Sequence, residues 1–212
     1  MKKTLLILIL NLCLIIGAMP FKGYIKYGRY HQQWVYAEGQ YLDGFMDGGW
    51  LFYSDSTKTD MIAKGSYLNG NTSNPGQYGI PKHGRNGLWE HYYPQSHYYN
   101  HFHLKNPKKS TQYWNDGKLS GKFTSYFKDG KIAVTCDYKD GKKNGHRKEW
   151  FQGGYMYTKL YRDTQYKKGA PINDKIYDYS NTTLSLQSSY IDDIRIDTLY
   201  SSNYKKSLYP GK

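Results

Sequence analysis

Aromatic and polar positions recur in a fixed order along this chain, and the order comes round four times. A tyrosine or tryptophan precedes an Asp-Gly pair, a second glycine comes four residues after the first, and an aromatic-rich stretch follows. The cleanest copies start at Tyr41 and Tyr138; a third starts at Trp114, and a fourth, with a degraded front half, at Gly87. Because units this short cannot bury their own apolar faces, we expect them to stack on one another.

The Asp-Gly pairs predict the turns of β-hairpins. Glycine adopts the positive φ of a two-residue hairpin turn without strain, so an Asp-Gly pair between β-forming residues is a strong hairpin signal. We predict positive φ at Gly44, Gly117 and Gly141, a further two-residue turn at Gly130, and another turn at 153–154. The chain should therefore run as a meander of antiparallel strands.

Alternation within one of these strands predicts which side chains share a face. After Gly130, side chains that alternate along a strand place Ile132, Val134, Cys136 and Tyr138 on one side. Cys136 in this row is expected to be a small buried residue and not a nucleophile.

The repeat length locates two insertions and a separate C-terminal segment. Gly121 and Gly145 lie 24 residues apart, whereas earlier glycines at the same position are farther apart. The excess places insertions near 69–85 and 94–110, in loops of the kind that often carry function. We predict repeats over 19–169, and a capping hairpin with a loose tail over 170–212.

The repeat resembles the MORN repeat, in particular the shorter variant found in bacterial proteins of the YwqK antitoxin-like family. The resemblance covers about residues 36–169 and departs from the family pattern at Arg147 and at the two insertions. It implies an all-β, elongated, single-layer β-hairpin meander without enzymatic activity. The matching residues are Tyr41, Gly44, Gly48, Trp50, Tyr53, Gly87, Trp89, Tyr92, Gly117, Gly121, Phe123, Tyr126, Tyr138, Gly141, Gly145 and Trp150.

Residues 1–18 have the layout of a secretory signal peptide. Lys2 and Lys3 precede an apolar run, and a small-residue cleavage site ends at Ala18. The run has about twelve residues, short of the roughly twenty that span a bilayer, although an uncleaved anchor is the alternative. We expect export to the periplasm, the outer surface or the extracellular space.

Composition and charge limit the classes of partner that this protein can bind. The chain has 25 tyrosines and 22 glycines, which suits a sheet with many tight turns and a core of rings. Without residues 1–18 it keeps 28 basic side chains against 17 acidic ones, and a single cysteine, so an intramolecular disulfide is excluded. The positive charge falls in 19–169 and attracts anionic partners. No groove-reading motif indicates nucleic acid.

Candidate chemistry is sparse. His97, His101 and His103 lie close together in the second insertion. The spacing of His97 and His101 would suit one face of a helix, whereas the spacing of His101 and His103 would suit one face of a strand. Since no single element aligns all three, we expect no metal site. The repeat aspartates stand at turn positions, where their side chains stabilise turns. We predict no catalytic residue, no cofactor and no enzymatic activity.

The paired rings suggest a binding face. Trp50 and Tyr53 are three residues apart, as are Phe123 and Tyr126, and this odd offset places the two rings of a pair on opposite faces of a strand. Either one set is exposed beside lysines, or the rings simply form the core. The candidate binding face is Trp50, Tyr53, Trp89, Tyr92, Phe123, Tyr126, Trp150, Lys139, Lys142 and Lys143.

Three functions from different classes follow. The first is an exported scaffold that binds a protein or an envelope component. The second is a surface module for carbohydrate or anionic lipid, with possible association with a membrane surface; it draws on a loose similarity to the Gly-Trp and Tyr-Tyr hairpin repeats of cell-wall-binding proteins. The third, and weakest, is an enzyme with its site in the insertion loops. A further alternative is an antitoxin or immunity-type protein, which the signal peptide disfavours.

Overall fold

A single open antiparallel sheet contains every described strand. The computed structural model describes residues 17–27, 33–73, 76–94, 106–153, 157–177, 184–191 and 194–199. Thirteen strands follow one another in sequence order, and the short β7 pairs with β6 beside this path. The strands are β1 (Met19–Tyr27), β2 (Gln33–Leu42), β3 (Phe45–Tyr53), β4 (Met61–Gly70), β5 (Arg85–Tyr92), β6 (Lys108–Asn115), β7 (Lys118–Leu119), β8 (Gly121–Tyr126), β9 (Ile132–Lys139), β10 (Lys142–Gly153), β11 (Tyr157–Lys167), β12 (Ala170–Tyr177), β13 (Leu184–Ile191) and β14 (Ile194–Leu199).

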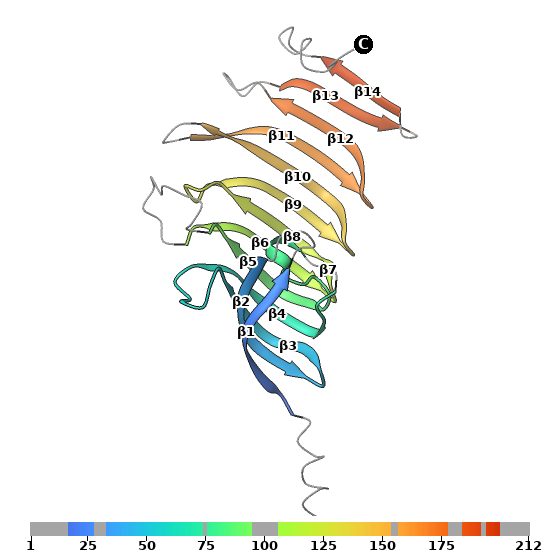
Figure 1. Ribbon diagram of the computed structural model, residues 1–212. Coiled ribbons are helices and arrows are strands. Elements are labelled where there is room, and N and C mark those ends of the chain that lie inside the picture. Colours follow the sequence, from blue (N-terminus) through green and yellow to red (C-terminus); the bar gives the residue numbers. More distant parts are fainter. Residues whose placement is uncertain are drawn as a thin grey trace, which may run out of the picture.

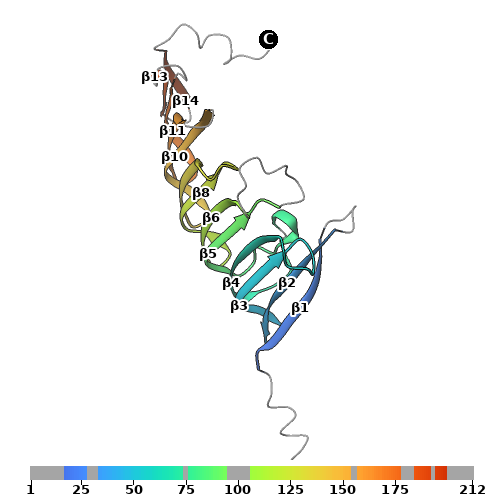
Figure 2. The same ribbon diagram turned by 90° about the vertical axis from the view of Figure 1, so that its left-hand side faces the viewer.

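The sheet is elongated and twists along its length (Figure 1). Seen after a quarter turn, the strands from β8 onward form one thin layer, whereas β1–β5 curl around the short helix η1 (Gln77–Gly79) (Figure 2). The meander predicted from the repeats is confirmed.

Consecutive antiparallel strands place their connections alternately at two edges of the sheet. The Asp-Gly turns after β2, β6 and β9 share one edge with the Lys168-Gly169 turn after β11. The predicted positive φ is confirmed at Gly44 (81°), Gly117 (70°) and Gly141 (79°), and the preceding aspartates are also positive at 44–51°. A two-residue turn with positive φ at both central residues has a twist that matches the twist of the flanking strands.

One of the predicted turns differs. The β8–β9 connection is longer than two residues: the Gly130 amide donates to the Phe127 carbonyl, and the Phe127 amide donates to the Lys131 carbonyl. Only Gly130 of the central residues has positive φ (84°), which fits a three-residue loop with a bulge. The turn predicted at 153–154 falls partly outside the described residues.

The meander also continues beyond the predicted repeats. Strand β12 starts at Ala170, and Pro171 pairs with Tyr166 where the β11–β12 register shifts. Proline lacks an amide and is tolerated at such irregular positions. Strands β13 and β14 then pair as the predicted terminal hairpin.

The first predicted insertion separates two strands that pair with each other. Tyr67 of β4 lies opposite Arg85 of β5, so the interrupted unit closes on its own partner strand. The segment between them crosses the curled part of the sheet, where η1 contacts β1 and β2, and Ile80 is fully buried. Most of the second insertion, including its three histidines, lies outside the described residues.

One face of the sheet, called the inner face here, carries the core. It holds the three tryptophans Trp50, Trp89 and Trp114. Their rings pack in sequence with other aromatics: Trp50 lies 6.0 Å from Phe52, and Tyr67 lies 4.9 Å from Trp89. The core cluster lies within residues 35–114 and comprises Val35, Ala37, Met46, Trp50, Phe52, Ile62, Ala63, Tyr67, Ile80, Trp89 and Trp114.

Candidate functional site

In the first units, a tryptophan of one strand lies directly over a glycine of the preceding strand. A Cβ atom built on Gly39 would stand 2.2 Å from the ring of Trp50, and one built on Gly65 would stand 2.2 Å from the ring of Trp89. Trp50 and Trp89 are 1% and 0% exposed. The glycines therefore let two large rings sit flat on the sheet.

The same inner-face position changes character along the chain. In the β9–β10 hairpin, Cys136 occupies the glycine position and Arg147 the tryptophan position, and the two are register partners. In the next hairpin, Thr164 lies opposite Asp174. Ring-on-glycine packing thus gives way to pairs of polar side chains, which explains why the core cluster lies within residues 35–114.

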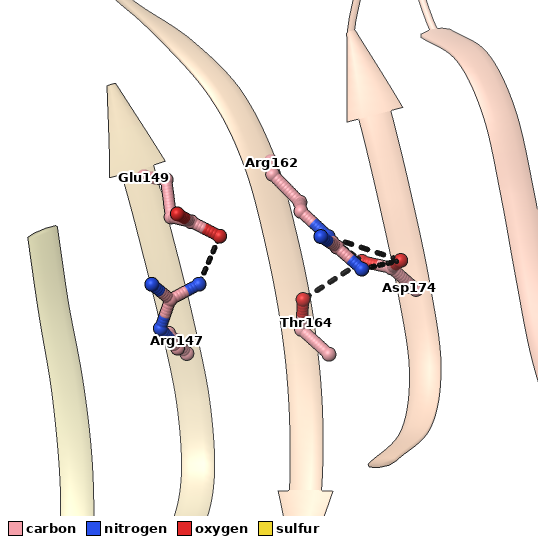
Figure 3. A network of polar contacts seen from close by, with 5 residues as sticks. All are labelled: Arg147, Glu149, Arg162, Thr164 and Asp174. Carbon is pink, nitrogen blue, oxygen red and sulfur yellow. Dashed lines mark hydrogen bonds and ion pairs between the residues drawn. The ribbon is translucent and has the colours of Figure 1, made fainter. Parts of the chain in front are cut away.

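The polar pairs of β10–β12 form a compact network on this inner face (Figure 3). The Arg162 guanidinium donates to both carboxylate oxygens of Asp174 at 2.7–3.1 Å, and the Thr164 hydroxyl donates to Asp174 Oδ1 at 2.7 Å. Arg147 contacts Glu149 on its own strand. Hydrogen bonding to Asp174 outweighs burial and raises the pKa of Arg162. Each carboxylate has a cationic partner, so the network contributes to packing rather than to acid–base chemistry.

A buried arginine closes the inner face of the N-terminal half. Arg85 is 2% exposed; its Nε donates to the Pro81 carbonyl at 2.8 Å and its Nη2 to the Ile80 carbonyl at 3.0 Å. The guanidinium lies 4.2 Å from the Trp89 ring centre and 5.0 Å from that of Trp114, a cation–π arrangement. Burial lowers the pKa of Arg85. The first insertion is thereby fixed over the core and covers it.

Beside this arginine, His91 is buried on the inner face. It is 4% exposed, its ring lies 6.1 Å from that of Trp89, and its Nδ1 has no hydrogen-bond partner among the described residues. Burial, together with the positive charges of Arg85 and Lys109, lowers the pKa of His91 to about 3. The ring is therefore neutral at physiological pH.

The opposite, outer face carries a charge cluster around Glu90. The Glu90 carboxylate accepts from Lys64 at 2.8 Å, Lys108 at 2.6 Å and the Tyr92 hydroxyl at 3.1 Å. Burial alone raises the pKa of Glu90, but hydrogen bonds from Lys108, Lys64 and Tyr92 outweigh it and lower the pKa to about 2. The cluster ties together β4, β5 and β6.

Successive turns at the Asp-Gly edge stack on one another. The Gly117 amide donates to the Arg85 carbonyl at 2.9 Å, the Gly141 amide to the Leu119 carbonyl at 2.8 Å, and the Gly169 amide to the Lys143 carbonyl at 2.8 Å. Each turn is thus bonded to the chain that leaves the turn before it.

This stacked edge, called the turn row here, is strongly basic. Within two residues of its turn glycines Gly84, Gly117, Gly141 and Gly169 it contains seven lysines against two aspartates, Asp116 and Asp140; the Asp43-Gly44 turn is not part of it. Five of the lysines are exposed, and none of the seven takes part in an ion pair within the described ranges. The lysines of the turn row are Lys82, Lys118, Lys139, Lys142, Lys143, Lys167 and Lys168.

The structure separates the residues predicted as one binding face. Trp50 and Trp89 are core residues, so they cannot provide an exposed surface; for these two rings the alternative, that they form the core, is correct. Tyr53 and Tyr92 are 7% and 9% exposed, and Tyr92 lies on the outer face with Glu90. Trp50 and Trp89 are buried because the inner face curls and the first insertion covers the core there.

The remaining predicted residues divide between two locations. Phe123, Tyr126 and Trp150 are partly exposed on β8 and β10. Lys139, Lys142 and Lys143 meet in the turn row. Of the other basic residues in this stretch, Arg147 lies on the inner face, and Lys131 pairs with Asp129 at the opposite edge at 3.5 Å. The lysines, not the rings, are the part that the fold brings together.

Sequence reasoning missed three features. Lys118, Lys167 and Lys168 were not grouped with Lys139, Lys142 and Lys143, although each adjoins a predicted or equivalent turn. A search for lysines within two residues of each turn glycine would have found them. The buried roles of Arg85 and Glu90 have no comparable sequence signal, since they depend on the crossing of the first insertion and on cross-strand register.

Other candidate chemistry stays limited. Cys136 is 2% exposed, and burial raises the pKa of its thiol, as expected for a structural cysteine. Within the described ranges no cluster of three histidine, cysteine or acidic residues could hold a metal ion. In that same part of the chain, no helix has the length and apolar character to cross a bilayer.

Comparison with known proteins adds no functional assignment. No family model matches this chain, and no curated protein shows significant similarity to its sequence.

Proposed function

We propose that this protein is an exported, non-enzymatic scaffold of MORN-type repeats that binds a component of the cell envelope along its turn row. The observation that carries the proposal is the stack of turns, because it gathers lysines from four separate hairpin connections onto one edge. Exposed lysines without ion pairs leave a positive potential that attracts an anionic partner.

The repeat assignment is supported by the equivalence of successive units. The Tyr41 and Tyr138 copies share the same turn geometry at Gly44 and Gly141 and the same register irregularity after the turn. Stacked units of this kind give extended surfaces, which repeat proteins generally use for binding. Because the described residues show no reactive constellation and provide such a surface, a binding role fits this protein better than a catalytic one.

Export is supported by where the sheet begins. Strand β1 starts at Met19, directly after the small residues that end at Ala18, so cleavage there would leave the sheet intact. This position disfavours the antitoxin alternative, which needs a cytosolic protein.

A carbohydrate- or lipid-binding module is the second candidate. It is favoured by rings beside the lysines: Lys143 Nζ lies 4.7 Å from the ring centre of Tyr166. Rings next to cations suit sugars and headgroups alike.

Retention on the native envelope tests the proposal. Purified mature protein is mixed with the envelope fraction of its native host, and the retained share is measured as salt is raised. We expect retention at low salt that declines steeply as screening shortens to about 8 Å near physiological ionic strength. The proposal would be refuted if the same amount of protein stays unbound with and without the envelope fraction, even at low salt.

A further inference from the structure

We infer that the partner of the turn row is a linear acidic polysaccharide, whose carboxylate groups meet successive lysine-bearing turns. This inference rests on the proposed function and names the chemistry of the partner. Three observations carry it: the charge of the turn row, its shape, and the rings beside it.

The charge is concentrated and repeated. Lysines flank three consecutive turns, at Lys118, at Lys139 and Lys142, and at Lys167 and Lys168. The opposite edge differs, because there Lys131 pairs with Asp129 and Lys58 pairs with Glu38. The turn row therefore offers lysines without ion pairs at three consecutive turns of the described sheet.

The intervals suit a linear polymer. Neighbouring strands are about 4.8 Å apart, so turns that recur every second strand stand about 10 Å apart. The turn row from the β4–β5 connection to the β11–β12 turn then measures about 30 Å. A chain with an anionic group roughly every 10 Å can pair with one turn after another.

The twist of the sheet favours such a polymer over a bilayer. Strands rotate by about 20–25° from one to the next, so over the six strand steps between them the lysines of the first and last turns point in directions about 120–150° apart. The twist is visible along the length of the sheet (Figures 1 and 2). A planar membrane can meet only part of the turn row at once, whereas a flexible polysaccharide can follow it.

Rings beside the lysines favour sugar over a bare polyanion. Tyr138 and Tyr166 lie on the inner face next to Lys143. Tyr138 is the register partner of Lys143 on the neighbouring strand, and the Nζ atom of Lys143 lies 4.7 Å from the centre of the Tyr166 ring. Both rings are partly exposed. A sugar ring can stack its C–H face on tyrosine while its acidic group meets the ammonium.

The test measures binding of the full mature chain to oligogalacturonates of increasing length. We expect affinity to rise about tenfold or more with length, and to level off once the oligomer spans about 30 Å, as successive turns are engaged. Charge reversal of Lys139, Lys142 and Lys143 to glutamate should lower affinity at least tenfold. Tyr166→Leu should weaken oligogalacturonate binding several-fold.

In the control variant, three lysines near the opposite edge are replaced by glutamate: Lys128, Lys159 and Lys175. Far-ultraviolet circular dichroism checks that each variant is folded. The control variant should keep most of its affinity. An equal loss in both triple variants, or an affinity independent of oligomer length, overturns the inference. Binding only to vesicles of equal parts phosphatidylglycerol and phosphatidylcholine also overturns it. Envelope retention without oligogalacturonate binding refutes this inference alone, whereas loss of envelope retention refutes the proposed function.

Discussion

Replacing Gly65 with alanine tests the ring-on-glycine packing of the core. The added methyl carbon would stand 2.2 Å from Cδ2 of Trp89 and 2.3 Å from Cε2, whereas carbon atoms normally pack at about 3.5–4.0 Å. The Trp89 ring cannot move away easily, since Arg85 lies 4.2 Å from its centre and Tyr67 packs at 4.9 Å.

The expected loss of stability follows from these contacts. Overpacking a well-packed core costs about 1–3 kcal/mol, and a displaced Trp89 would also weaken its contact with Arg85, worth about 1 kcal/mol. We expect the free energy of unfolding to fall by about 3 kcal/mol, which corresponds to a decrease in Tm of about 6–12 °C for a chain of this size.

Urea denaturation followed by circular dichroism measures the effect. Gly49→Ala is the matched control, because no atom lies within 4 Å of its built Cβ, and it should change stability by less than about 0.5 kcal/mol. Combining Gly65→Ala with Trp89→Leu should remove most of the added cost of the alanine. A Gly65→Ala protein as stable as the wild type would refute the packing argument.

Three further predictions concern the turns, pH and processing. Gly141→Val should lower the free energy of unfolding by about 1–2 kcal/mol or more, because φ is 79° there; unchanged urea stability contradicts this. The pKa of His91 falls from 6.5 to about 3 on folding, so the unfolded state binds a proton more readily than the folded state. The free energy of unfolding should therefore decline as the pH falls from about 6.5 toward 3. His91→Leu should flatten this decline, and a variant with an unaltered pH profile would contradict the prediction. N-terminal sequencing of protein from its native host should begin at Met19, and an intact Met1 on a cytosolic product would contradict export.

The repeat pattern predicted the architecture because each of its signals is local. An Asp-Gly pair fixes positive φ at Gly44, Gly117 and Gly141 through the steric freedom of glycine, whatever surrounds it. Strand order then follows, since two-residue turns join neighbouring antiparallel strands. Gly130 shows the limit, because the same dipeptide there belongs to a longer loop.

The candidate site was only partly predictable because it depends on what covers each face. The odd offset of Trp50 and Tyr53 suggested opposite faces, which the register bears out, but it did not indicate that both rings are buried. The crossing of the first insertion, held by Arg85, is a long-range contact that no local pattern encodes. Lysines close to turn glycines, in contrast, could have been grouped from spacing alone.

Hydrogen exchange of the envelope-bound protein tests the central claim, that the turn row is the contact surface. The mature chain is exchanged free and bound to the native envelope fraction, and peptides are compared by mass spectrometry. We predict slower exchange confined to peptides that contain Gly117, Gly141 and Gly169, with no change over 54–60 and 127–131 at the opposite edge. Protection at the opposite edge, with the turn row unchanged, would contradict the account.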